Sequence, residues 1–379
     1  MKRARLLYYV GMISLLAACH NGVKHNYPKD IIGNWKNPRA IRHAMGGYMS
    51  FYNNDTVNYY WEFYKRHQEK PDEEYKYEFF GTKARYRFSG DSLFVFDPAE
   101  KTWDSLHIFK LNTDTLILGK TGWDTLLKQH YSYDTLPKFD KIVIVGSGGF
   151  GTTAWIGADE ILSSDGTLLF GGGGMKGIEG FYKAKISVNK FEEIDDNFRR
   201  ADIKHIKTVF VYPATDQVVI WFTFVKDGRI YKSIRDAGQA GPAEFEAAYP
   251  SLWYLYRYIP KLCIDSVKSF QENSIPPWQG FSSGDSVLRL SMSENFLLNE
   301  YLMEGKKADT AFNEQFDLSP AELRLNNKLS KGNLTKVTSD GRFYKYYYYQ
   351  EKPLIIDIGF NFIERNTTVL KFKNADDKN

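Results

Sequence analysis

The sequence predicts a β-rich α+β fold, in which an N-terminal antiparallel barrel or sandwich is followed by α+β domains with antiparallel sheets. Aromatic residues make up 16% of the 379 residues, and they favour pleated, half-buried surfaces. An Asp followed by Ser or Thr and then Leu recurs at short intervals, and Asp closes turns by bonding its own backbone. Evenly spaced short strands with such turns are typical of a barrel or sandwich. The turn positions are Asp91, Asp104, Asp114, Asp124 and Asp134.

The N-terminus has the layout of a secretory signal peptide, which we place at residues 1–18. Basic residues precede an apolar run, Leu6 to Leu16, that is too short to span a bilayer. The run ends in Leu-Ala-Ala-Cys19, which resembles the lipobox of bacterial lipoproteins. This resemblance implies cleavage before Cys19, a diacylglyceryl group on its thiol and an acylated amine. Two acyl chains or more form a stable anchor; the alternative is a plain signal peptide.

The resemblance also bears on location and partners. His20, rather than Asp, follows the cysteine, which by analogy with Gram-negative lipoproteins implies the outer membrane but neither of its faces. The formal net charge of +4 includes Lys2, Arg3 and Arg5, and without these three it is +1. We therefore expect no nucleic-acid partner. The expected partners are the membrane, through the lipid anchor, and either a small apolar ligand or an envelope protein.

Residues 19–29 are polar and are expected to form a tether, and residues 30–137 to form the antiparallel β domain. The entry to this domain reads Gly33-Asn-Trp35, and it resembles the first signature of lipocalin-like proteins. The resemblance implies that Trp35 closes the base of a barrel. It also implies a small apolar or amphipathic ligand inside.

The pattern of strand-like and helical stretches in residues 138–262 predicts an α+β domain. Asp165-Gly166 and Asp227-Gly228 mark hairpin turns between strand-like runs, and Ser187 is a plausible N-cap for a helix. Pro250 is expected to break or kink a second helix. The C-terminal region, 263–379, is expected to hold a strand at 286–290, a helix around 294–303 and a capping box at 319–322.

Glycines in the middle region present a fingerprint that a dinucleotide site also uses. Gly146-x-Gly148-x-x-Gly151 follows an apolar run, but no helical pattern follows Gly151. Asp165, at the offset of the required acid, lies in a turn. The sequence therefore favours a connection between antiparallel strands, and we expect no cofactor.

The same stretch, Ser147 to Ala154, resembles the Ser-Gly-Cys-Phe-Gly-x-Cys-Pro signature of a lipoprotein domain family of unknown function. Both cysteines of the signature are absent here, so the resemblance implies an architecture and no activity.

A candidate binding loop follows from the strand order. Antiparallel hairpins would place residues 146–151 and 171–174 at the same end of one sheet. Successive free N–H groups there can form a nest for an anionic ligand or a partner peptide; the alternative is that both stretches are simple turns. The candidate residues are Gly148, Gly149, Phe150, Gly151, Gly172 and Gly173.

No catalytic or metal-binding residues emerge from the sequence. The seven His are scattered without metal-ligand spacing. Gly280-x-Ser282-x-Gly284 fits a nucleophile elbow, but it lacks the strand before it and the helix after it. The remaining cysteine, Cys263, is expected to be a buried small hydrophobe.

These observations predict a lipid-anchored envelope protein that acts as a non-catalytic binding module, with a small ligand in the barrel. The alternative is an interaction protein that docks on other envelope proteins or glycans, and an enzyme is a more distant third. A hollow barrel would favour the first reading, whereas a filled barrel with exposed aromatic residues would favour the second.

Overall fold

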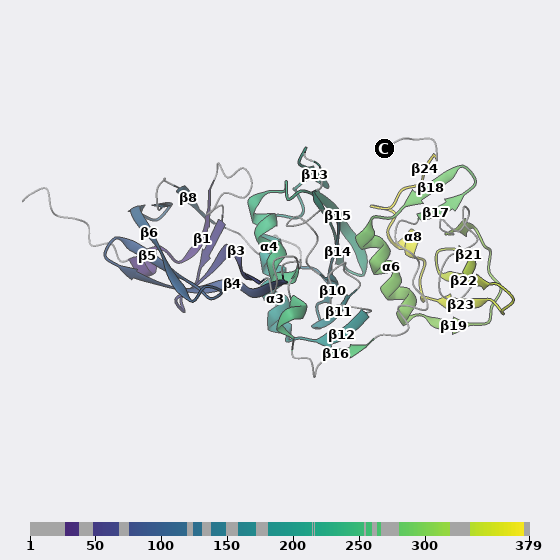
Figure 1. Ribbon diagram of the computed structural model, residues 1–379. Helices are drawn as coiled ribbons and strands as arrows, with labels where there is room; N and C mark the ends of the chain where they lie inside the picture. Colours follow the sequence, from purple (N-terminus) through teal and green to yellow (C-terminus); the bar gives the residue numbers. More distant parts are fainter. Residues whose placement is uncertain are drawn as a thin grey trace, which may run out of the picture. The chain divides into compact units, whose positions relative to one another are not determined.

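The computed structural model of the chain consists of two compact units, separated in the sequence between His130 and Tyr131 (Figure 1). No helix among the residues that it describes is long and apolar enough to cross a membrane. The described residues are 27–37, 48–67, 76–119, 124–130, 138–148, 158–171, 181–213, 215, 217–253, 255–259, 264–266, 280–318 and 334–374.

The first unit is a closed antiparallel barrel of eight strands, in which β1 pairs with both β2 and β8. Of the two predicted architectures, barrel and sandwich, the barrel is therefore confirmed. A helical turn, α2 (Tyr27–Asp30), precedes it and includes the last residues of the segment expected to be a tether. The strands are β1 (Gly33–Lys36), β2 (Tyr48–Phe51), β3 (Thr56–His67), β4 (Lys76–Ser89), β5 (Ser92–Asp97), β6 (Thr102–Leu111), β7 (Thr115–Gly119) and β8 (Asp124–Gln129).

One of the predicted turn positions is wrong. Asp104 lies inside β6, where it pairs with Val95 of β5. The turn is instead closed by Asp97, whose carboxylate accepts hydrogen bonds from the amides of Ala99 at 2.8 Å and Glu100 at 3.0 Å. Asp91 and Asp114 do lie in turns, Asp124 begins β8, and Asp134 is outside the described residues.

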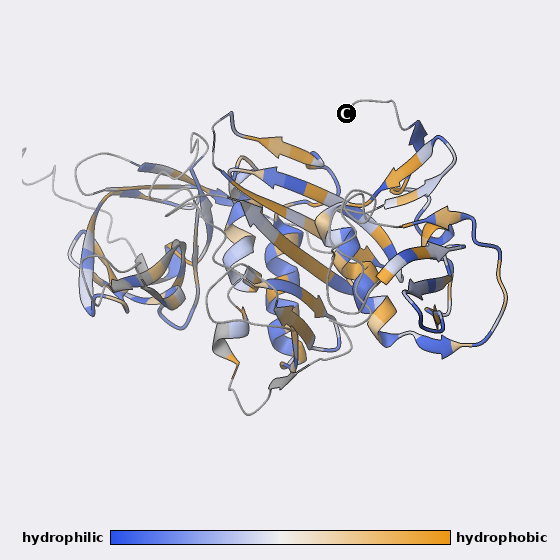
Figure 2. Ribbon diagram, turned by 45° about the vertical axis from the view of Figure 1, so that its right-hand side comes forward, coloured by the Kyte–Doolittle hydropathy of each residue, from blue (hydrophilic) through white to orange (hydrophobic). Residues whose placement is uncertain are grey.

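The second unit opens with an eight-stranded sheet in the order β13-β15-β14-β9-β10-β11-β12-β16. Only the β13–β15 pair among these neighbours is parallel. Figure 2 shows hydrophobic residues along the central strands. The strands are β9 (Lys141–Gly148), β10 (Asp159–Ser163), β11 (Thr167–Gly171), β12 (Phe181–Lys185), β13 (Val209–Val211), β14 (Val218–Lys226), β15 (Arg229–Ala237) and β16 (Ile264–Ser266).

Local signals place the turns and helices of this sheet as predicted. The β14–β15 hairpin turns at Asp227 and Gly228, whose φ angles of 52° and 67° suit a tight two-residue turn. Helix α3 (Val188–Arg200) begins after Ser187, whose hydroxyl accepts a hydrogen bond from the amide of Lys190. Helix α4 (Ala243–Trp253) continues through Pro250, so the predicted break at that residue is wrong. A 3₁₀ turn, η3, covers Leu255–Tyr258.

A second eight-stranded sheet, ordered β19-β23-β22-β21-β20-β17-β18-β24, completes the unit. Helix α6 (Met292–Glu304) starts at a capping box formed by Ser291 and Glu294, which the sequence analysis missed. The capping box expected at 319–322 lies outside the described residues. The other elements are β17 (Gly280–Ser283), β18 (Ser286–Arg289), β19 (Lys306–Ala308), β20 (Phe316–Asp317), β21 (Leu334–Ser339), β22 (Phe343–Tyr348), β23 (Leu354–Asp357), α8 (Phe362–Arg365) and β24 (Lys373–Asn374).

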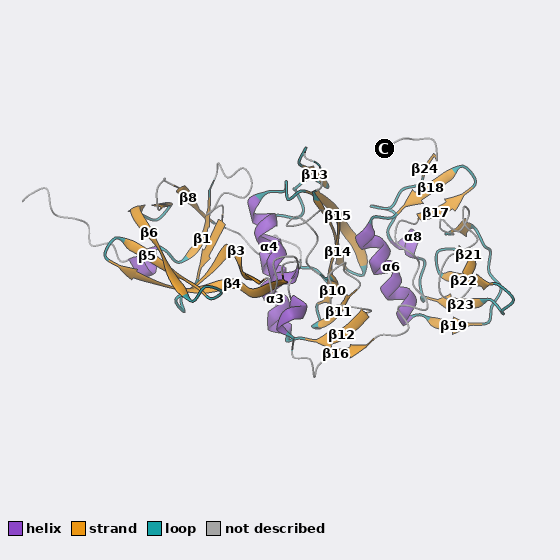
Figure 3. Ribbon diagram, viewed as in Figure 1, coloured by secondary structure: helices purple, strands orange, loops and turns teal. Residues whose placement is uncertain are grey.

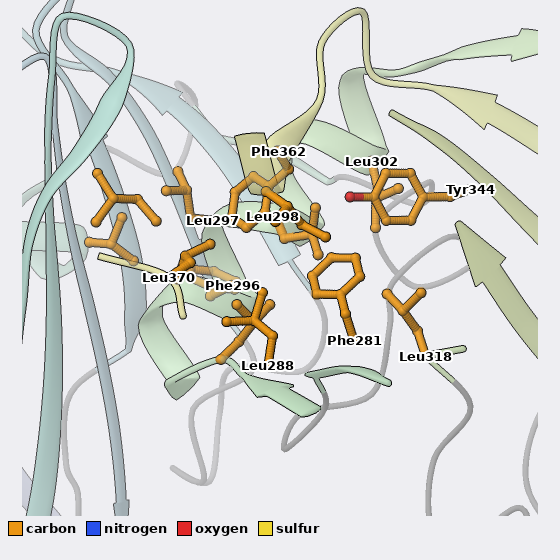
Figure 4. Packing of buried hydrophobic residues seen from close by; sticks show 14 of the residues in the cluster. Phe281, Leu288, Phe296, Leu297, Leu298, Leu302, Leu318, Tyr344, Phe362 and Leu370 are labelled. Carbon is orange, nitrogen blue, oxygen red and sulfur yellow. The ribbon is translucent and has the colours of Figure 1, made fainter. Parts of the chain in front are cut away.

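Helix α6 joins the two sheets into one hydrophobic core. It contacts β9 and β14 of the first sheet, and its Leu297, Leu298 and Leu302 are buried in the same cluster as Phe281 and Tyr344 of the second (Figure 4). Helices α3 and α4 contact each other, and α4 also contacts β10 (Figure 3). The middle and C-terminal regions therefore form a single packed unit.

Candidate functional site

Trp35 lies at the end of the barrel where β1 begins, and its side chain is fully buried. Its indole N–H donates a hydrogen bond to the carbonyl oxygen of Ile31 at 2.6 Å. The ammonium group of Lys128 lies 5.1 Å from the centroid of the Trp35 ring and donates to the carbonyl oxygen of Asp30 at 3.1 Å. Trp35 is thus packed in the barrel core beside the segment that precedes β1, and its role in closing the barrel base stays a prediction.

Side chains from all eight strands contribute to the buried core of the barrel. Successive residues of a strand point to opposite faces, so every second residue enters the core. The buried residues of the interior are Ile31, Trp35, Met49, Phe51, Val57, Phe63, Ala84, Tyr86, Leu93, Val95, Ala99, Ile108, Leu111, Leu116, Leu118 and Leu126.

A pocket of about 480 Å³ opens at the base of the barrel, lined by Lys29, Ile32, Asn53, Asp55 and Tyr86. Burial and, to a lesser extent, the charge of Asp55 raise the pKa of the Tyr86 phenol to about 12. That hydroxyl therefore stays protonated at neutral pH, and it donates to the carbonyl oxygen of Tyr52 at 3.3 Å. The lining combines the aliphatic Ile32 and the Tyr86 ring with charged and amide groups, a mixture that suits a small amphipathic ligand.

The outside of the barrel carries a cluster that the sequence analysis missed, which we call the arginine–aromatic face. It comprises Arg85 and Arg87 of β4, Phe94 and Phe96 of β5, and Trp103 of β6. The Arg87 guanidinium lies 4.6 Å from the centroid of the Trp103 ring and 5.2 Å from that of Phe94. The Arg85 guanidinium lies 5.1 Å from the Phe96 ring. Both arginines are exposed, and the rings are partly exposed.

Cations over aromatic rings gain electrostatic attraction, which fixes side chains that are otherwise flexible. The guanidinium N–H edges remain able to bind oxyanions in a bidentate manner. Further along β6, His107 and Phe109 stack edge to face at 4.6 Å, and 45% of Phe109 is exposed. The arginine–aromatic face can therefore bind an extended anionic partner.

Strands β5 and β6 pair with each other. The outward positions along this strand pair hold no Asp or Glu. The inward positions hold Leu93 and Val95, so their neighbours along the strand point outward. The outward residues are Ser92, Phe94 and Phe96 on β5, and Trp103, Ser105 and His107 on β6.

The candidate binding loop lies partly within the described residues. Strands β9 and β11 both run antiparallel to β10, so Gly148 and Gly171 lie at the same end of the sheet, as predicted from the strand order. Gly149, Phe150, Gly151, Gly172 and Gly173 lie outside the described residues, as do Cys19 and Cys263. Anion binding by this loop stays a prediction.

Two acids that the sequence analysis did not single out begin β10 at this end. Asp159 accepts a hydrogen bond from the Gly146 amide at 3.2 Å, and burial raises the pKa of its carboxyl to about 7. Glu160 is fully buried, and neither of its carboxyl oxygens makes a regular hydrogen bond in the described structure. Burial raises the pKa of Glu160 well above its usual range, although the backbone amide of Tyr256 partly offsets this.

The region around these acids has a family assignment. Residues 156–256 match DUF6438, a domain of unknown function. The DUF6438 domain spans β10 to β15 with α3 and α4, while β9, which pairs with β10 and β14 in the middle of the sheet, precedes it. The chain has no match among curated proteins or among solved structures.

The strand pairing also bears on the glycine fingerprint next to the DUF6438 domain. A dinucleotide site needs parallel strands joined by a helix, whereas β10 is antiparallel to β9. Asp165 lies in the β10–β11 turn, where it accepts a hydrogen bond from the Thr167 amide at 2.9 Å. Ser282 likewise lies in a hairpin, β17–β18, rather than between a strand and a helix.

Within the described ranges, no three His, Cys, Asp or Glu side chains gather in a way that could hold a metal ion. The most developed surface for recognition among the described residues is therefore the arginine–aromatic face, with the base pocket as the second.

Proposed function

We propose that the chain is a lipid-anchored protein of the Gram-negative outer membrane that acts as a non-catalytic binding module. The lipobox-like Leu-Ala-Ala-Cys19 supports the anchor. The binding role rests on a surface that is built for recognition and on the absence of any residue set in the sequence that points to a particular reaction.

The observation that carries the binding role is the arginine–aromatic face. Arg85 and Arg87 are held over aromatic rings on the outside of the barrel, at 5.1 Å from Phe96 and 4.6 Å from Trp103. Because the rings restrict the two arginines, less side-chain entropy is lost when they bind an oxyanion. We infer that the module docks on an anionic component of the envelope.

The arginine–aromatic face favours this docking role over ligand storage in the barrel. A second candidate function remains, the binding of a small amphipathic ligand, and the base pocket of about 480 Å³ favours it. The lining residues of that pocket come from the segment before β1, the β2–β3 turn and, through Tyr86, strand β4.

Binding of a fluorescent sulfated oligosaccharide tests the docking role. The probe is titrated into the mature chain from residue 20, which retains every described residue. We expect saturable binding that Arg85→Gln with Arg87→Gln weakens at least tenfold. The control is Lys306→Gln with Lys307→Gln, which removes two exposed charges from β19 and should leave the affinity unchanged. Equal loss in both double variants would indicate non-specific charge attraction and reject the proposed site.

A further inference from the structure

We propose that the arginine–aromatic face docks on an anionic lipid surface, so that the barrel lies against the membrane that holds the anchor. This inference rests on the proposed function and names its partner. Its starting point is the combination of exposed guanidinium groups with partly exposed rings on neighbouring strands.

The residue types match the chemistry of a membrane interface. Trp and Tyr concentrate where the hydrocarbon meets the headgroups, because their rings are amphipathic. Arginines near an anionic surface add electrostatic attraction to its headgroups. The guanidinium groups of Arg85 and Arg87 lie 6.0 Å and 4.6 Å from the centroid of the Trp103 ring, so both contributions act around this ring.

Charge complementarity extends beyond the two arginines. The outward positions where β5 and β6 pair hold Ser, Phe, Trp and His, and no Asp or Glu. Asp97, at the end of β5, turns back to cap its own loop. A negative surface that approaches the outer face of β5 and β6 would therefore meet cations and rings, while the exposed Asp104 follows Trp103 at a position of opposite alternation.

Other partners fit the arginine–aromatic face less well. A peptide that adds a strand needs a free sheet edge, and the closed barrel offers none because β1 pairs with β8. A single sugar needs a concave site, and the base pocket uses none of the residues of this face. The binding groups are instead spread over three adjacent strands (Figure 1), as an extended lipid surface requires.

The position of the anchor allows the contact. Strand β1 begins at Gly33, a short distance in sequence after Cys19. Fully extended, the intervening chain reaches at most about 50 Å. An anchored barrel would therefore stay close to the bilayer, where even a modest attraction is amplified by the high effective concentration.

Vesicle sedimentation separates this inference from the proposed function. The mature chain from residue 20, which lacks the lipid, is mixed with vesicles of phosphatidylcholine alone or with an equal part of phosphatidylglycerol. We expect binding to the anionic vesicles only, reduced by salt. Arg85→Gln with Arg87→Gln should weaken vesicle binding about tenfold or more. Trp103→Ala should also weaken binding, although it changes no charge. Lys306→Gln with Lys307→Gln should leave binding unchanged.

Each contrary result has a distinct meaning. Equal binding to neutral vesicles, or unchanged binding of the arginine double variant, would overturn the lipid surface as partner. Binding of the sulfated oligosaccharide through Arg85 and Arg87 without binding to anionic vesicles would overturn this inference and leave the docking role standing. Binding to neither probe would reject both.

Discussion

The Arg87 guanidinium lies 4.6 Å from the centroid of the Trp103 ring on the outside of the barrel. Strand β5 separates the strands that carry these two residues, and its Phe94 lies under the same guanidinium at 5.2 Å. The cation is thus held by two rings from two strands. Such an arrangement contributes about 0.5–1 kcal/mol at an exposed site, so it orients a binding group more than it stabilises the fold.

The proposed lipid anchor predicts a change in membrane retention. Cys19→Ala removes the thiol that the lipobox-like sequence would present for modification. We expect the variant to partition into the aqueous phase of a detergent extraction, whereas the wild type enters the detergent phase. Retention of the variant in the detergent phase would refute the anchor.

Trp35 predicts a large loss of stability on truncation. Trp35→Ala removes a fully buried ring and its hydrogen bond to Ile31. We expect the free energy of unfolding of the barrel to fall by about 3–5 kcal/mol in denaturant titrations. Trp103→Ala deletes the same side chain from the outer surface and serves as the control, with an expected loss of about 1 kcal/mol. Similar losses in both variants would contradict the assigned buried position.

The buried carboxyl of Asp159 predicts that the second unit is more stable at acidic pH. Burial raises the pKa of its carboxyl from 3.8 to about 7, so the folded state holds this proton between about pH 4 and pH 7 while the unfolded chain does not. The contribution to stability is therefore complete below about pH 4, lost as the pH rises to about 7, and constant above. Glu160, whose pKa is also raised, acts in the same direction.

Denaturant titrations at several pH values check the sign. Asp159→Asn and Glu160→Gln should each flatten the decline in stability between about pH 4 and pH 7. Asp165→Asn is the matched control. The Lys185 hydrogen bond lowers the pKa of Asp165 to about 2, so this substitution should lower stability by a constant amount above about pH 4, and the difference from the wild type should shrink as the pH falls from about 4 to 2. A steeper decline in the Asp159 variant would contradict its assigned burial.

Two glycines share a positive φ angle, but we expect their replacement by Ala to lower stability by different amounts. Gly166 and Gly90 both have positive φ angles, 84° and 56°. A Cβ at Gly166 would lie 2.3 Å from the Ile186 carbonyl oxygen, whereas a Cβ at Gly90 meets nothing within 4 Å. Both Ala variants carry the backbone penalty of about 1–2 kcal/mol, but only Gly166→Ala adds a steric clash. In thermal unfolding, Gly166→Ala should lower the melting temperature of its unit more than Gly90→Ala lowers that of the barrel. The opposite order would contradict the turn geometry.

Local chemistry explains what the sequence predicted of the fold. The turn at Asp227-Gly228 and the cap at Ser187 depend on residues within a few positions, and both were found as expected. The periodic turns predicted an antiparallel barrel or sandwich, and the barrel is the one that forms. Of the break or kink expected at Pro250, the break is wrong because helix α4 continues to Trp253, and the kink stays a prediction.

The arginine–aromatic face escaped prediction for a physical reason. Strand β5 reads Ser-Leu-Phe-Val-Phe-Asp, so residues of both faces are apolar and alternation does not reveal which face is buried. Only the packing of Leu93 and Val95 into the barrel turns Phe94 and Phe96 outward. The buried acids were missed likewise, since the residues that cover Glu160 come from distant parts of the chain, such as Tyr256.

Charge reversal of the two arginines tests the central claim most directly, because it changes the sign of the face and leaves the barrel core untouched. The mature chain with Arg85→Glu and Arg87→Glu is titrated with the sulfated oligosaccharide and, separately, with a cationic oligolysine. The account predicts that the variant loses the anionic probe and gains measurable affinity for oligolysine, with an unchanged melting temperature of the barrel. Wild-type affinity for the anionic probe in this variant would contradict the account.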